Sequence, residues 1–97
     1  MFPHLIQIVI PIKYSSFYHY IYEIKEIMEM IKGFYEYHSH LSLEHKSKLE
    51  HRYITLYQFI ERCYKVIQED QGMDELKAIH QESYESIQLI KNTFMNE

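Results

Sequence analysis

Histidines are the residues of this chain whose type and spacing come nearest to a chemical site. There are seven, and four of them fall within residues 38–51. A metal site there would draw on five ligands, namely His38, His40, Glu44, His45 and His51. Known helical metal sites use Glu-x-x-His pairs, His-x-x-x-His or Cys-x-x-Cys spacings, and the sequence contains none of these. We therefore expect no metal and no other cofactor, and a metal-binding bundle that uses these five residues is kept as an alternative.

Nucleophilic catalysis has no usable set of residues. The single cysteine, Cys63, occupies an apolar helical position, which is typical of a small buried side chain. There is no Gly-x-Ser-x-Gly motif, and the two glycines are too few and too isolated to form a phosphate-binding loop. We therefore expect this chain not to be an enzyme.

Tyrosines give the strongest functional signal. The chain has ten Tyr and five Phe but no Trp, and a Tyr ring with its polar tip suits half-buried and interface positions. Two helical stripes of tyrosine form the predicted partner-binding surface: Tyr14, Tyr18, Tyr22, Tyr53, Tyr57 and Tyr64. Acidic residues border the first stripe and the chain carries a net charge of −4, whereas a nucleic-acid groove is basic. The predicted partner is therefore another protein, and a nucleic-acid-associated role is a disfavoured alternative.

Three long segments with helical periodicity must position these residues. We predict helices over residues 16–38, 42–69 and 75–94, with Ser15 or Ser16 capping the first and Asp74 the third. Apolar residues step by four and three along each segment, including Phe17, Ile21, Ile24, Met28 and Ile31 in the first. The third seam is the weakest because it includes His80 and Ser83. Short connections join antiparallel neighbours, so the prediction is an all-α, antiparallel three-helix bundle with the second helix at its centre.

The first twelve residues form an apolar N-terminal arm whose conformation the sequence leaves open between strand and helix. The arm is too short to span a membrane and lacks the features of a signal peptide. We expect residues 1–97 to form one domain that dimerises through the first two helices and the arm. The predicted dimer residues are Leu5, Ile8, Val9, Ile12, Phe17, Ile24 and Ile31.

These features together predict a soluble, cytoplasmic, non-catalytic interaction protein that acts as a regulator, inhibitor or assembly factor. The bias toward Ile, Tyr, Lys and Glu is typical of an AT-rich genome, such as that of a low-GC bacterium or a phage. A structural virion or connector subunit is a further alternative, which predicts a higher symmetric oligomer.

Overall fold

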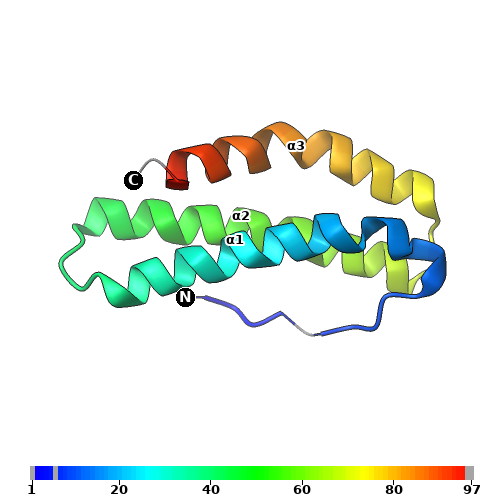
Figure 1. The fold of residues 1–97 in the computed structure, drawn as a ribbon, viewed down its shortest axis with the longest axis horizontal. Helices are drawn as coiled ribbons and strands as arrows, with labels where there is room; N and C mark the ends of the chain where they lie inside the picture. Colours follow the sequence, from blue (N-terminus) through cyan, green and yellow to red (C-terminus); the bar gives the residue numbers. More distant parts are fainter. Residues whose placement is uncertain (1, 6, 96–97) are drawn as a thin grey trace.

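The computed structural model describes residues 2–5 and 7–95, with side chains as far as Thr93. Four helical elements follow one another: η1 (Ile12–Phe17), a 3₁₀ helix, and the α-helices α1 (Tyr18–Tyr37), α2 (Leu43–Gln68) and α3 (Met73–Met95). Figure 1 shows α1 and α2 as an antiparallel hairpin, with α3 returning along α2. The predicted all-α, antiparallel three-helix bundle is confirmed.

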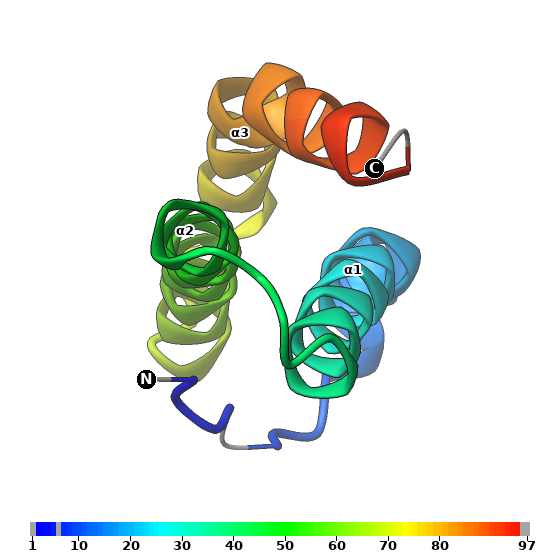
Figure 2. The same cartoon turned by 90° about the vertical axis from the view of Figure 1, so that its left-hand side faces the viewer.

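The core lies where the apolar faces of the three helices meet. The predicted seam of α2 is buried, and Ile24, Ile31, Leu56 and Ile60 have no exposed surface. The predicted seam of the first helix is buried as far as Ile31, whereas Tyr35 is half-buried and His38, with which it was expected to end, is exposed. Figure 2 shows α2 at the corner of the bundle, with α1 and α3 further from each other than from α2. Because each helix keeps a polar face, no helix of the described chain is long and apolar enough to cross a bilayer.

Local backbone chemistry sets the ends of α2. The side chain of Ser42 accepts a hydrogen bond from the His45 amide at 3.1 Å and caps the first turn, as expected for a helix that begins after a serine. At the other end, Asp70 and Gly72 adopt φ angles of +51° and +102°, a left-handed region that glycine enters readily. The predicted turn before α3 is therefore present, but Asp74 lies inside the first turn of α3 rather than at its cap.

The start of α1 differs from the prediction. Neither Ser15 nor Ser16 caps the helix, because both already belong to η1, which begins directly after Pro11. The amide of Tyr14 donates to the Pro11 carbonyl at 2.9 Å, and the amide of Tyr18 donates to the Ser15 carbonyl. Backbone carbonyls therefore accept the hydrogen bonds of these amides, which leaves less need for a serine side chain to act as the cap.

The arm packs on its own bundle. Its described residues before Ile12 are in neither helix nor strand, and they run along the α1–α2 pair on the side away from α3 (Figures 1 and 2). The Phe2 ring meets the rings of Tyr35 and Tyr53 edge to face, at centroid distances of 4.8 and 4.7 Å. The Tyr53 hydroxyl donates to the Pro3 carbonyl at 3.0 Å, so the arm covers one long face of the helical hairpin.

The predicted dimer residues do not form one surface. Phe17, Ile24 and Ile31 are buried inside the monomer, at 9%, 0% and 0% exposure, and have little or no area left for a second copy, which corrects the expectation for these three. Leu5 and Ile8 are half-buried against the same core, whereas Val9 and Ile12 are 91% and 90% exposed. A four-and-three seam does not distinguish contacts within a chain from contacts between chains, which is why the prediction failed here.

Candidate partner-binding surface

Three of the six predicted partner-binding tyrosines belong to the core. Tyr14, Tyr53 and Tyr64 are 1%, 3% and 7% exposed, so none of them offers a ring to a partner. The Tyr14 hydroxyl donates to Asp70 Oδ1 at 2.6 Å and accepts from the Gly72 amide at 3.1 Å, which fastens η1 to the turn before α3. The hydrogen bond to Asp70 raises the pKa of Tyr14 above its usual value.

Tyr18 and Tyr22 remain at the surface, one turn apart on α1. Their rings stack at a centroid distance of 6.1 Å and an interplanar angle of 15°, and the two residues are 52% and 49% exposed. Stacking holds each ring in place, so less side-chain freedom is lost when a partner covers them. Tyr57 is half-buried on α2, where it lines a separate cleft of about 150 Å³ beside Leu5 and Ile8.

Two clefts flank the tyrosine pair. One, of about 470 Å³, lies between the arm and α1, and its lining includes Val9, Tyr18 and Tyr22. The other, of about 480 Å³, is lined by Tyr22, Ile27, Met30 and polar residues of α1 and α3. We call the surface formed by Tyr18, Tyr22 and these two clefts the Tyr18–Tyr22 surface. It combines fixed aromatic rings with hollows on both sides, a shape that can receive protruding side chains.

The charges around the Tyr18–Tyr22 surface are mixed. Lys91 Nζ lies 3.0 Å from Glu23 Oε1, and Lys25 donates to Gln7 at 3.5 Å while it lies over the Tyr64 ring. Glu26 is exposed and lines the second cleft. A platform for single-stranded nucleic acid would instead pair its aromatic rings with a basic groove.

The histidines of residues 38–51 are not brought together as a site. His38 stacks on Phe34 at 4.1 Å, and its Nδ1 lies 3.1 Å from the Phe34 carbonyl oxygen. His40 lies in the exposed turn, and His51 is exposed on α2. Across the described part of the chain, no three His, Cys, Asp or Glu side chains are grouped so that they could hold a metal. The arrangement therefore gives no support to the alternative set that also included Glu44 and His45.

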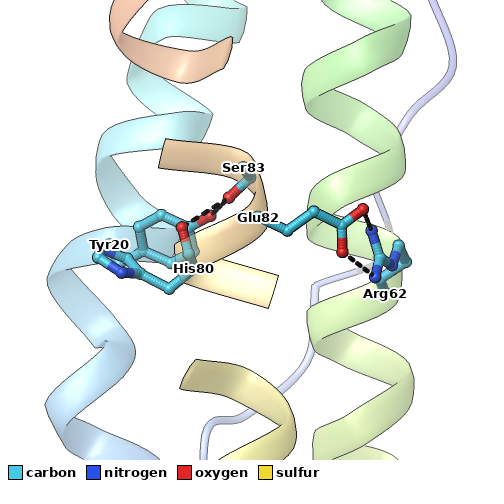
Figure 3. A network of polar contacts seen from close by, with 5 residues as sticks. All are labelled: Tyr20, Arg62, His80, Glu82 and Ser83. Carbon is cyan, nitrogen blue, oxygen red and sulfur yellow. Dashed lines mark hydrogen bonds and ion pairs between the residues drawn. The ribbon is translucent and has the colours of Figure 1, made fainter. Parts of the chain in front are cut away.

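A polar network ties α3 to both other helices (Figure 3). The Tyr20 hydroxyl is hydrogen-bonded to Ser83 Oγ, and the Tyr20 ring packs against His80 at 4.6 Å. On the α2 side, Arg62 donates two hydrogen bonds to Glu82, at 3.0 and 2.9 Å. Burial raises the pKa of Tyr20 to about 12. The polar positions of the third seam, His80 and Ser83, were the sequence signal for this network.

The remaining candidate for chemistry is the thiol of Cys63. It has no exposed surface, and burial raises its pKa to about 11, against the weaker opposing effect of Arg62. A thiol that is protonated and covered at neutral pH is a poor nucleophile.

Compared with known proteins, the chain matches no family model, no curated protein and no solved structure.

Proposed function

We propose that this chain is a non-catalytic protein–protein interaction module that binds another protein through the Tyr18–Tyr22 surface. It would act as a small regulator, inhibitor or assembly factor. One observation carries the proposal: two stacked, half-exposed tyrosines stand between two clefts of about 470 and 480 Å³. Tyrosine is enriched among the residues that dominate binding energy at protein interfaces.

The non-catalytic role is supported by where the candidate nucleophiles lie. Cys63 and Ser83 both have no exposed surface, and Ser83 Oγ is already bonded to the Tyr20 hydroxyl. A free buried thiol is compatible with a reducing compartment, so we propose the cytoplasm as the site of action. The mixed charges beside the tyrosines favour a protein over a nucleic acid as the partner.

The test is affinity capture with two matched variants. The tagged chain is expressed in the organism that encodes it, and captured proteins are quantified by mass spectrometry. Tyr18→Ala with Tyr22→Ala is expected to reduce capture of the specific partner about 30-fold, since a hot-spot pair contributes ~2 kcal/mol or more. The control is Tyr37→Ala, which removes an 86% exposed tyrosine from the far end of α1 and is expected to leave capture unchanged.

Circular dichroism of each variant checks that the helices persist. Equal capture by the wild type and the double variant would show that the Tyr18–Tyr22 surface is not the binding site. A wild type that enriches no protein over an untagged control would contradict the proposed role itself.

A further inference from the structure

The arm packs against a surface of α1 and α2 that we call its seat. Phe2 fits between Tyr35 and Tyr53, and the Tyr53 hydroxyl donates to the Pro3 carbonyl. Further along the arm, three more apolar side chains pack against the core: Leu5, Ile8 and Ile10. The seat itself is made by helical residues alone, so the identical arm of a second copy would fit it equally well.

The chain is held firmly where the arm ends. Lys13 Nζ lies 2.6 Å from Asp70 Oδ1, and Tyr14 is bonded to the same carboxylate and to the Gly72 amide. While these contacts hold, the arm can leave its seat by rotation in the residues before Lys13, and residues 9–12, most of them exposed, are the nearest to the anchor. Pro11 is extended there, with φ −58° and ψ 152°, and a proline also keeps the preceding residue extended. Nine residues of fully extended chain span at most about 30 Å, which sets the greatest reach of a released arm.

The pivot is apolar and uncovered in the monomer. Val9 and Ile12 flank Ile10 and Pro11 and are 91% and 90% exposed. Val9 also lines the cleft beside Tyr18 and Tyr22, so the exposed apolar area continues onto α1. Two chains that crossed at this pivot would cover these side chains on both copies, which the closed monomer leaves in water.

We propose that two copies of this chain exchange arms, so that residues 2–5 and 7–10 of each copy occupy the α1–α2 seat of the other. Exchange keeps every contact of the arm and adds burial of the Val9 and Ile12 side chains at the crossing. Only this added burial opposes the entropy lost on association, so the dimer forms in a concentration-dependent equilibrium. The inference rests on the proposed interaction role only in that a second copy is one of the partners.

The experiment uses the full chain with p-benzoylphenylalanine in place of Phe2. Isotopically heavy and light chains are mixed at concentrations from about 1 to about 200 µM, irradiated and digested. The expected products are a covalent dimer and peptides that join a heavy arm to a light α1 or α2. In parallel, native mass spectrometry is expected to show a dimer of the unmodified chain that increases with concentration.

A hinge variant separates arm exchange from dimerisation by another face. Val9→Ser with Ile12→Ser is expected to lower the dimer fraction about tenfold, because the crossing then buries little apolar surface. The matched control, Leu89→Ser, changes a 67% exposed side chain on α3 and is expected to leave the dimer unchanged. A chain that stays monomeric, a hinge variant that dimerises like the wild type, or the absence of crosslinks between two copies would each overturn the inference. None of these outcomes affects the capture test of Tyr18 and Tyr22, so the two proposals fail separately.

Discussion

The hydrogen bond between Tyr20 and Ser83 gives a test of how α3 is held on α1. Ser83 has no exposed surface, and apart from the bond to Tyr20 its Oγ makes one long hydrogen bond, of 3.4 Å, to the His80 carbonyl oxygen. Tyr20→Phe leaves this buried hydroxyl with that long contact alone, which is expected to lower the free energy of unfolding by ~1–2 kcal/mol. Ser83→Ala removes the partner of the Tyr20 hydroxyl. Because Tyr20 is only half-buried, water can replace that partner in part, and the expected loss in the free energy of unfolding is about 1 kcal/mol. The double variant removes both polar groups, so its loss should be smaller than the sum of the two by about 1 kcal/mol.

Urea unfolding followed by circular dichroism measures all four members of this cycle. Tyr84→Phe is the control, because Tyr84 is 52% exposed and its ring lies 5.8 Å from that of His80, so its change should stay within about 0.5 kcal/mol. Losses that simply add in the double variant would refute the reasoning, since the two groups would then not be coupled. Single variants as stable as the wild type would refute it equally.

Alkaline pH provides a separate test of the burial of Tyr20, because burial raises the pKa of its hydroxyl while the hydrogen bond to Ser83 lowers it. Because burial raises the pKa of Tyr20 to about 12 in the folded chain, the unfolded chain loses this proton first, near pH 10. The stabilisation by Tyr20 is therefore complete below pH 10 and is lost as the pH rises through about 12. The stability difference between wild type and Tyr20→Phe should be constant from pH 7 to pH 9 and should shrink at pH 11. A difference that grows with pH would contradict this sign.

Two further substitutions are expected to stabilise the chain. The Tyr64 hydroxyl is buried with no hydrogen-bond partner in the described structure, so Tyr64→Phe should raise the free energy of unfolding by ~1 kcal/mol. A destabilised Tyr64→Phe variant in urea unfolding would show that the hydroxyl is satisfied, for example by water. Gly33 is an exposed residue within α1, and an added Cβ would meet nothing within 4 Å, so Gly33→Ala should stabilise by ~0.5–1 kcal/mol. An unchanged or lower thermal midpoint of Gly33→Ala would contradict that expectation.

Periodicity was sufficient to predict the helices because each one buries a continuous apolar face. The predicted ends of α2 and α3 lie within two residues of the observed ones, since Ser42 and Gly72 mark real changes of backbone conformation. The start of α1 was predicted less well. A 3₁₀ helix advances one turn in three residues instead of 3.6, so Tyr14 rotates away from the edge that Tyr18 and Tyr22 share and enters the core.

Long-range contacts explain why Tyr53, in the second predicted tyrosine stripe, is buried. Tyr53 is buried because Phe2 and Pro3, some fifty positions earlier, lie against it. No local pattern in α2 encodes the position of the arm, so a tyrosine beneath the arm and one in solvent look alike in the sequence. The pairing of Tyr20 with Ser83 was hidden in the same way, because it joins residues that are 63 positions apart.

Fewer apolar and aromatic side chains are left for an interaction surface in the structure than the two predicted tyrosine stripes and the arm would have supplied. Three of the predicted binding tyrosines are buried in the core. Leu5, Ile8 and Ile10 of the arm are half-buried because they pack against the same core. Val9, Ile12, Tyr18 and Tyr22 remain exposed around the start of the helical region, whereas other exposed apolar side chains, such as Tyr37, Leu43 and Leu89, lie apart from them. Apolar side chains scattered singly over a surface need no explanation, but Val9, Tyr18 and Tyr22 line one cleft and so form a group. The start of the helical region therefore carries both proposals: its tyrosines offer a surface to a partner protein, and its pivot allows a second copy to supply the arm.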